Sequence, residues 1–326
     1  MRAVVCKAWG EPENLTLEDV EPPALDPGAV RIAVKACGVN FADVLLVAGT
    51  YQTKPDFPFS PGLEVAGEVL ECAPDVGGLE SGQRVVATVD HGGFAEQVVA
   101  SAERVIPIPA AMDFTSAAAF PVAYGTSHLG LAYKAGLKAG ETLLVLGATG
   151  GVGLTAVEIG KKMGATVIAC AGGPEKLKVA AEYGADHLID YAAEDIRARA
   201  KELTEGRGVD VVYDPVGGAA FDSAMGAAAR GGRLLIVGFA SGKVPQIPAN
   251  ILLVKNITAI GYYWGAHWTL DPALVRRSFD ALFEWYGEGA LRPRVSHTFD
   301  LADAAAALRT LIARKSTGKI VVTVGD

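Results

Sequence analysis

Residues 147–153 read Gly-Ala-Thr-Gly-Gly-Val-Gly, so four of seven consecutive positions lack a side chain. The apolar run Thr142–Leu146 precedes this segment, and the helical pattern Val152–Met163 follows it. A glycine-rich turn between a strand and a helix lets the backbone approach a pyrophosphate, while the helix start offers free N–H groups and the positive end of its dipole. The segment therefore predicts a dinucleotide-binding loop whose contacts come from Gly150, Gly151, Val152 and Gly153.

The loop departs from the strict G-x-G-x-x-G register, which would fall on positions 148, 150 and 153. Ala148 takes the place of the first glycine. The alternative is a glycine-rich turn that binds nothing. The density of glycines between a clear strand and a clear helix makes that alternative the weaker of the two.

The end of the next apolar run, Thr166–Ala171, carries no acid. Loops that bind NAD usually present Asp or Glu there to the ribose hydroxyls. Gly172 and Gly173 follow and leave room for a bulkier ribose substituent, which Lys176 could reach. These residues favour a cofactor with a 2′-phosphate, although most lysines on a helix surface are simply solvated.

Cysteine and histidine side chains are scattered along the chain. The cysteines form no C-x-x-C pair, which predicts a reducing, cytoplasmic environment without a disulfide framework. The histidines show no metal-ligand spacing, so no metal site is expected. The positions are Cys6, Cys37, Cys72, Cys170, His91, His128, His187, His267 and His297.

The elements that must position the glycine loop follow from the hydrophobic pattern. Short apolar runs broken by Gly and Pro in the first ~120 residues predict a β-rich domain. From about residue 140, strands alternate with helices, which is typical of βαβ units and a parallel sheet. The predicted strands are Thr142–Leu146, Thr166–Ala171, His187–Ile189, Val209–Tyr213, Arg233–Val237 and Ile257–Ile260, and the helices between them are Val152–Met163, Pro174–Tyr183, Glu194–Leu203 and Ala219–Ala229. Helices Asp271–Tyr286 and Leu301–Ala313 and strand Lys319–Val324 complete the chain.

Composition limits the function classes. The chain has 326 residues, 50% of them hydrophobic and 20% charged, which suits two globular domains. A formal net charge of -8 gives no reason to bind nucleic acid or an anionic membrane. No apolar run approaches the roughly 20 residues that span a bilayer. The N-terminal residues lack the apolar stretch of a signal peptide.

Several segments together resemble the zinc-independent NADPH:quinone oxidoreductases, the zeta-crystallin-like branch of the medium-chain dehydrogenase/reductase superfamily. Each segment alone is a weak signal, but the ordered set covers essentially the whole chain. The segments are Ala36–Asp43, Gly49–Tyr51, Pro61–Gly67, Gly92–Glu96, Gly147–Gly153, Asp214–Gly218 and Arg314–Lys319.

The resemblance implies an α/β fold that joins a GroES-like, β-rich catalytic domain to a Rossmann domain with a doubly wound parallel sheet. We expect the catalytic domain at residues 1–121 and 266–326 and the NADPH-binding domain at residues 122–265. The active-site cleft would then lie between the domains, as ligand sites often do.

Zinc is not expected on the same grounds. The zinc-dependent alcohol dehydrogenases of this superfamily have Cys at the position of Asn40 and His at that of Leu63, and a catalytic zinc needs three such ligands. Cys37 is the one rival candidate, and we interpret it as a small core residue.

The resemblance also implies site residues. Asn40 and Tyr51 would line the substrate cleft, where each could donate a hydrogen bond to a carbonyl oxygen as charge develops. A turn-capping Asn and a packed Tyr are the structural alternatives. Thr126, Gly238, Phe239 and Ala240 would contact the nicotinamide half of the cofactor, and the 2′-phosphate would meet Gly172, Lys176, Tyr191 and Arg314.

One departure from the family matters. Several relatives carry Tyr and Arg in the segment after the asparagine, where this chain has Leu45 and Val47, so a more apolar cleft is expected. Tyr262, Tyr263 and Trp264 would form an aromatic wall there or belong to the core.

The function favoured by the sequence is hydride transfer from NADPH to a quinone. Reduction of an activated alkene, such as an enone, an alkenal or an acrylyl thioester, needs the same apparatus and stays open. A non-catalytic NADPH-binding protein is a third possibility. The partners expected are a small-molecule substrate and a second copy of the chain, joined through the edge strand Ile257–Ile260.

Overall fold

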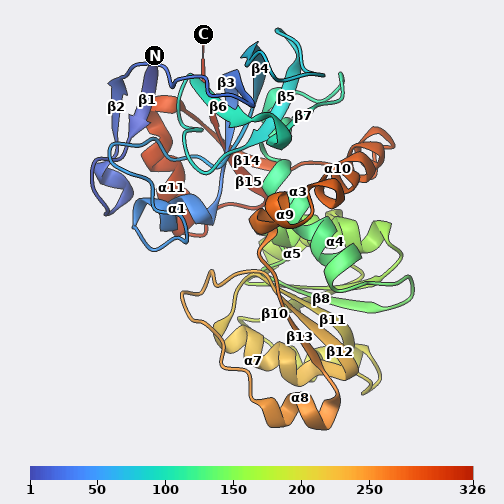
Figure 1. The fold of residues 1–326 in the computed structure, drawn as a ribbon. Coiled ribbons are helices and arrows are strands. Elements are labelled where there is room, and N and C mark those ends of the chain that lie inside the picture. The colour runs from blue at the N-terminus through green and yellow to red at the C-terminus, as the bar shows by residue number, and fades with distance from the viewer. Residues whose placement is uncertain (326) are drawn as a thin grey trace. The chain divides into compact units, whose positions relative to one another are not determined.

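The structure is a computed structural model and describes residues 1–325. It divides into two compact units, of which the first comprises Met1–Val122 with Pro293–Asp326 and the second comprises Ala123–Arg292. The second unit is therefore an insertion in the first. Figure 1 shows the C-terminal elements beside the N-terminal ones within the first unit.

The first unit is built on a seven-stranded sheet with the order β14-β15-β3-β4-β5-β7, and β6 pairs with β3. β1 and β2 form a separate antiparallel pair. The strands are β1 (Arg2–Val5), β2 (Thr16–Asp19), β3 (Ala29–Val39), β4 (Glu64–Cys72), β5 (Arg84–Thr88), β6 (Gln97–Ser101), β7 (Val105–Pro107), β14 (Val295–Asp300) and β15 (Lys319–Thr323). The helices are α1 (Phe41–Val47), α2 (Phe114–Ala118) and α11 (Ala304–Ile312), with short turns η1 (Pro12–Asn14), η2 (Ala102–Arg104) and η5 (Leu301–Asp303).

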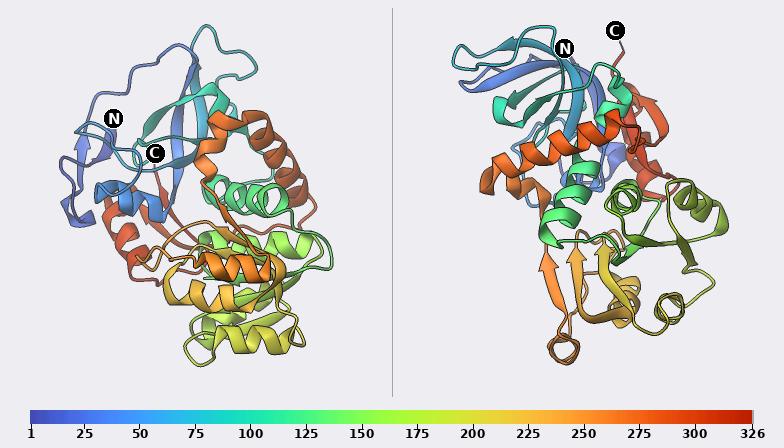
Figure 2. Two further views of the ribbon diagram at one scale, coloured as in Figure 1. Left: turned by 60° about the horizontal axis from the view of Figure 1, so that its bottom comes forward. Right: turned by 90° about the vertical axis from the view of Figure 1, so that its right-hand side faces the viewer.

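The second unit contains a six-stranded parallel sheet with the order β10-β9-β8-β11-β12-β13. Its strands are β8 (Thr142–Leu146), β9 (Thr166–Ala171), β10 (His187–Asp190), β11 (Val209–Asp214), β12 (Ala228–Ile236) and β13 (Thr258–Gly261). Its helices, seen in Figure 2, are α4 (Gly151–Lys162), α5 (Pro174–Glu182), α6 (Ile196–Leu203), α7 (Gly218–Ala227), α8 (Ala249–Lys255), α9 (His267–Leu270) and α10 (Pro272–Gly287), with η3 (Leu129–Lys134) and η4 (Trp264–Ala266). Helix α3 (Pro121–His128) carries the chain from the first unit into the second.

This architecture confirms the expected fold class, a β-rich domain joined to a doubly wound parallel sheet. The predicted strands and helices differ from the observed ones mainly at their ends. The largest difference is at β12, where the strand begins at Ala228 rather than Arg233.

Residues 266–292 cluster with the second unit, whereas the sequence analysis expected them in the catalytic domain. Helix α10 packs through Phe279 against Trp264 and Trp268, which belong to the same unit. The buried Nδ1 of His128 also lies 2.7 Å from the hydroxyl of Ser278 on α10. These contacts join the segment to α3 and to the chain that leaves β13.

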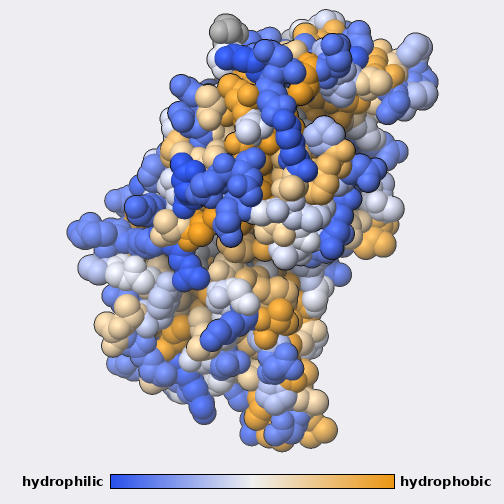
Figure 3. Space-filling model, turned by 90° about the vertical axis from the view of Figure 1, so that its left-hand side faces the viewer, coloured by the Kyte–Doolittle hydropathy of each residue, from blue (hydrophilic) through white to orange (hydrophobic). Residues whose placement is uncertain are grey.

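Strand β13 is at the edge of the parallel sheet, as predicted, and helix α8 precedes it. Two apolar side chains on α8 are exposed, Leu253 at 76% and Val254 at 60%. Figure 3 shows hydrophobic groups at the end of the second unit where Figure 1 places α8.

A buried carboxyl on α4 holds both ends of the inserted unit. The hydroxyl of Tyr124, near the first residue of the unit, donates to Oε2 of Glu158 at 2.6 Å. The backbone N–H of Arg292, the last residue of the unit, donates to Oε1 at 2.9 Å. Burial raises the pKa of Glu158 to about 7, against the lowering effects of these two hydrogen bonds.

The raised pKa of Glu158 predicts a pH-dependent stability. The native protein retains a proton that the unfolded chain releases above its ordinary pKa of 4.5, so the free energy of unfolding falls as pH rises from 4.5 toward 7 and stays reduced above that. The free energy of unfolding should fall between about pH 5 and about pH 8 in the parent. In Glu158→Gln we expect this decrease to be smaller by roughly 2–3 kcal/mol.

Urea denaturation at several pH values measures this difference. Glu182→Gln, which neutralises an exposed acid on α5, is the control and should keep the parent's pH dependence. A parent-like dependence in Glu158→Gln would contradict the expected protonation.

Candidate functional site

The glycine loop lies between β8 and α4, as the sequence predicts. Gly147 has a φ of +58°, and α4 begins at Gly151 after the N-cap residue Gly150. A Cβ at Gly153 would overlap the backbone oxygen of Gly147, so only glycine allows this close passage of helix and turn. The first N–H groups of a helix have no acceptor within it. The loop therefore has the backbone approach and the free donors that a pyrophosphate requires.

Hydroxyl groups fix α3 against the first turn of α4. Ser127 on α3 donates to the backbone oxygen of Val152 at 2.8 Å. Its hydroxyl also lies 2.8 Å from that of Thr155 and 2.9 Å from that of Tyr213. Thr126, a predicted nicotinamide contact, is the adjacent buried residue, so this cluster ties its position to the glycine loop.

The ends of β9 and β10 bring together residues predicted for the 2′-phosphate. A Cβ at Gly172 would lie 3.1 Å from the hydroxyl of Tyr191, so the tyrosine ring covers the glycine. Lys176 is half-buried in the first turn of α5, two positions after Pro174. The structure therefore brings the ends of β9 and β10 together, and Lys176 lies in the first turn of the helix that follows β9.

Asp190 is a residue that the sequence analysis missed. It ends β10, and its Oδ1 accepts the N–H groups of Gly173 and Ala192, each at 3.0 Å. An acid therefore lies beside the end of β9 after all, contributed by the neighbouring strand. Its bonds to two backbone donors shape the turn.

Asp214 holds the turn after β11 in the same way as Asp190 holds the turn after β10. Its buried Oδ1 accepts the N–H groups of Val216 and Gly217, each at 2.8 Å, and burial raises its pKa. Its backbone oxygen accepts the N–H of Gly238 at 3.2 Å. Asp214 therefore supports the loop after β12 that contains the predicted residues Gly238, Phe239 and Ala240.

The aromatic residues after β13 differ in their exposure to solvent. Tyr262 and Trp264 are buried, and the hydroxyl of Tyr262 donates to the backbone oxygen of Thr126 at 3.1 Å. Tyr263 is 48% exposed. The sequence analysis left open whether these residues form an aromatic wall or belong to the core. Tyr262 and Trp264 belong to the core of the second unit.

In the first unit, Asn40 lies in a buried polar cluster with Glu64 and Lys319. Asn40 follows β3, Glu64 begins β4 and Lys319 begins β15. Both β4 and β15 run antiparallel to β3, so the end of β3 meets the beginnings of the other two. Gly38 makes room for the cluster, because a Cβ there would lie 2.6 Å from Oε1 of Glu64.

Every polar atom of the ion pair has a partner. Nζ of Lys319 donates to the backbone oxygen of Val39 at 2.9 Å, to Oδ1 of Asn40 at 2.7 Å and to Oε1 of Glu64 at 2.7 Å. Oε2 of Glu64 accepts the N–H of Val122 at 2.8 Å. Lys319 is 6% exposed and Glu64 is fully buried, so water screens the pair little.

The side-chain amide of Asn40 is also engaged. Its Nδ2 donates to Oε1 of Glu64 at 2.8 Å and to the backbone oxygen of Gly38 at 3.3 Å. The second bond is longer than the usual range for N–H···O bonds. A ligand that accepts from Asn40 would therefore compete with the carbonyl of Gly38.

Asp43 adds a further buried acid. Its Oδ2 accepts the backbone N–H of Asn40 at 2.7 Å, and its Oδ1 has no hydrogen-bond partner among residues 1–325. Burial raises the pKa of Asp43 to about 7, although the hydrogen bond from Asn40 and the charge of Lys319 lower it.

Tyr51, Val47 and Arg314 are further residues of the first unit that the sequence analysis singled out. Tyr51 is half-buried against the hydrophobic core, and its backbone N–H donates to the oxygen of Leu45 at 3.1 Å. Val47 is buried in that core. Arg314 is exposed in the turn after α11 with a φ of +55°. It belongs to the first unit, whereas Lys176 and Tyr191 belong to the second.

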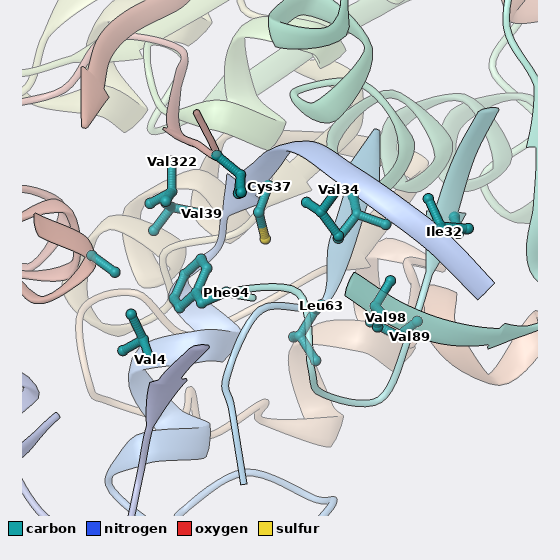
Figure 4. Close-up of a cluster of buried hydrophobic side chains, with 14 of the residues drawn as sticks. Val4, Ile32, Val34, Cys37, Val39, Leu63, Val89, Phe94, Val98 and Val322 are labelled. Carbon is teal, nitrogen blue, oxygen red and sulfur yellow. The ribbon is translucent and has the colours of Figure 1, made fainter. Parts of the chain in front are cut away.

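Two positions singled out for zinc ligands in the sequence analysis hold Asn40 and Leu63. Figure 4 shows Leu63 and Cys37 among hydrophobic side chains, and burial raises the pKa of the Cys37 thiol well above its usual range. Across residues 1–325, no three His, Cys, Asp or Glu side chains form a group that could hold a metal ion. Burial also lowers the pKa of His128 to about 4, in keeping with its hydrogen bond to Ser278.

No helix within residues 1–325 is long and apolar enough to cross a membrane.

Comparison with known protein families gives two matches. The family described as "Alcohol dehydrogenase GroES-like domain" matches residues 26–110, in the first unit. The family described as "Zinc-binding dehydrogenase" matches residues 151–284, in the second.

Individual relatives cover nearly the whole chain. A quinone oxidoreductase-like protein 2 homolog of Nematostella vectensis is 43% identical over 98% of this chain and 88% of its own length. The quinone oxidoreductase of Thermus thermophilus, whose structure is also described in complex with NADPH, is 36% identical, with a TM-score of 0.86 over 99% of this chain and 100% of that one. The Escherichia coli quinone oxidoreductase complexed with NADPH is 28% identical, with a TM-score of 0.92 over the same shares of both chains.

The glycine loop allows a matched test. Gly153→Ala places a methyl group onto the backbone oxygen of Gly147, whereas the Cβ of Gly150→Ala would lie 3.4 Å from that same oxygen. We expect Gly153→Ala to lower the free energy of unfolding by about 1–3 kcal/mol, and Gly150→Ala to change it by less than about 1 kcal/mol. Thermal and denaturant unfolding measure both variants. Equal stabilities would show that the loop can relax around the methyl group.

Proposed function

The chain belongs to the quinone oxidoreductase group of the medium-chain dehydrogenase/reductases, and we propose that it reduces quinones with NADPH and without zinc. The observation that carries this proposal is the 43% identity to a quinone oxidoreductase-like protein over 98% of the chain. The glycine loop and the Asn40 cluster supply the two halves of the chemistry, cofactor binding and charge stabilisation.

NADPH fits the residues at the strand ends of the second unit. The pyrophosphate would meet the loop at Gly150–Gly153, and the nicotinamide half would meet Thr126 and the loop after β12. Lys176, Tyr191 and Arg314 would hold the 2′-phosphate, while Asp190 keeps its backbone partners. When bound, the cofactor supplies the hydride, and the protein orients it.

This assignment predicts a preference for NADPH over NADH. Two or three charge-assisted contacts to a phosphate contribute roughly 1.5–3 kcal/mol each, so NADPH should bind more than about a hundredfold more tightly than NADH. Lys176→Ala should reduce the ratio of the NADH to the NADPH dissociation constant by about tenfold.

Fluorescence titration gives both dissociation constants. Lys178→Ala is the matched control, because Lys178 is a lysine of the same helix to which no cofactor contact is assigned, and it pairs with Glu175 at 2.7 Å. The idea fails if the parent binds both cofactors equally.

Zinc independence is supported by the buried lysine. The ammonium of Lys319 already places a positive charge 2.7 Å from Oδ1 of Asn40 and 2.7 Å from Oε1 of Glu64. A zinc ion beside Asn40 would meet this charge and would find an amide and Leu63 in place of thiolate and imidazole.

A quinone suits such a site because it is electrophilic without a Lewis acid. Hydride addition leaves negative charge on a quinone oxygen, and a proton then completes the hydroquinone. We assign Asn40 and Tyr51 as the hydrogen-bond donors to that oxygen. Asn40 would donate the N–H that otherwise bonds to Gly38 at 3.3 Å.

The assignment of Asn40 and Tyr51 predicts a loss of turnover. Asn40→Ala and Tyr51→Phe should each lower kcat for 1,4-benzoquinone by up to about a hundredfold, because each removes one donor to a developing oxyanion. NADPH affinity should stay nearly unchanged. Tyr133→Phe, at a 47% exposed tyrosine, is the control and should retain parent turnover.

Stopped-flow NADPH oxidation measures these rates after dialysis of each protein against a strong chelator, which should leave the parent active. If both variants match the parent, the role assignment is wrong. If the parent reduces enones and no quinone, an activated alkene is the substrate.

The exposed edge around β13 favours a homodimer, because an open apolar sheet edge invites pairing unless a partner covers it. Leu253→Glu should shift the protein from dimer to monomer in sedimentation at micromolar concentration. Leu270→Glu, at a 73% exposed leucine that ends α9, is the control and should leave the dimer intact. A monomeric parent would refute the dimer.

The remaining partners follow from charge and cysteine chemistry. The net charge of -8 favours a small-molecule substrate over nucleic acid or an anionic membrane. The four cysteines are free, and three are buried, which fits a reducing compartment such as the cytoplasm.

A further inference from the structure

The side-chain amide of Asn40 has two polar ends of nearly the same size, and rotation by 180° would exchange them. In the structure, Oδ1 faces the ammonium of Lys319 and Nδ2 faces the carboxylate of Glu64. The exchanged orientation would place Oδ1 against Glu64 Oε1 and Nδ2 against Lys319 Nζ. Both contacts would then be repulsive, so the ion pair permits one orientation of the amide.

Burial makes this selection strong. Asn40 is 9% exposed, Lys319 is 6% exposed and Glu64 is fully buried, so little water can compensate for a mismatched contact. The ion pair is itself held by backbone groups, the oxygen of Val39 and the N–H of Val122. Neither charge can turn away without losing a bond to the backbone.

We propose that Lys319 and Glu64 are positioning residues that hold the Asn40 amide with one N–H group available for an oxyanion. The inference rests on the proposed role of Asn40 in quinone reduction. A charge-assisted bond at Oδ1 polarises the amide and strengthens its N–H groups as donors. Glu64 holds one N–H at 2.8 Å, which leaves the N–H at 3.3 Å from Gly38 as the one that can be exchanged.

Stability alone does not account for the pair. Replacing a buried ion pair by apolar residues of similar volume is often neutral or stabilising. Apolar residues at positions 64 and 319 could not select one orientation of the Asn40 amide, whereas the charges of Glu64 and Lys319 do.

A double-mutant cycle tests whether the pair acts through Asn40. Glu64→Gln/Lys319→Met removes both charges together and leaves neither unpaired. It should lower kcat for 1,4-benzoquinone by about tenfold in the parent background, while the same change in Asn40→Ala should lower it by less than about twofold. NADPH affinity should stay within about twofold throughout. Glu141→Gln, which breaks the ion pair with Arg233 in the second unit, is the control and should keep parent turnover.

Equal losses in both backgrounds would overturn the inference and leave the proposed function intact. Parent-like turnover of Asn40→Ala would overturn the role of Asn40 itself, and the inference with it.

A second readout needs neither cofactor nor turnover. In protein labelled with ¹⁵N-asparagine, the two Nδ2 hydrogens of Asn40 should give widely separated resonances that exchange slowly with solvent, because one is bonded to a carboxylate. Glu64→Gln/Lys319→Met should bring the two resonances together and speed their exchange, with the thermal unfolding of the variant recorded alongside. Unchanged resonances in a folded variant would show that the pair does not orient the amide.

Discussion

The carboxylate of Glu64 and the ammonium of Lys319 are removed from water, and such charges are costly unless each of their polar atoms has a partner. The first unit meets that requirement at the point where one end of β3 lies between the starts of β4 and β15. Gly38 has no side chain where the carboxylate approaches, and the backbone of Val39 and Val122 supplies the remaining bonds. The ends of three strands are therefore placed by the need to satisfy one buried ion pair.

In the second unit, carboxylates at the ends of strands have backbone N–H groups as partners in place of a charged side chain. Asp190 and Asp214 each use one carboxylate oxygen to hold two backbone N–H groups after a parallel strand. Ser127 fixes the first turn of α4 through a backbone oxygen. Asp190 thus shapes the turns that contain Gly173 and Ala192, and Asp214 supports the loop that contains Gly238.

The parallel strands were predictable because strands covered on both faces are apolar throughout, and the glycine loop because its spacing has few other uses. Lys319 and Asp190 were not, because each is a single polar residue at the end of a strand. The partners of Lys319 lie 279 and 255 positions away in the chain, and no local pattern records such a pairing. The assignment of α10 to the second unit likewise depends on contacts of Phe279 and Ser278 that only the folded chain reveals.

Glu158 joins the two ends of the inserted unit through a single carboxyl, since Tyr124 lies near its first residue and Arg292 is its last. A segment whose ends meet in this way can interrupt another domain without pulling its host apart. The second unit thus has the geometry of a transferable cassette. A gene segment that encodes residues 123–292 would contain Glu158, Tyr124 and Arg292, and so all the groups of this contact between its two ends.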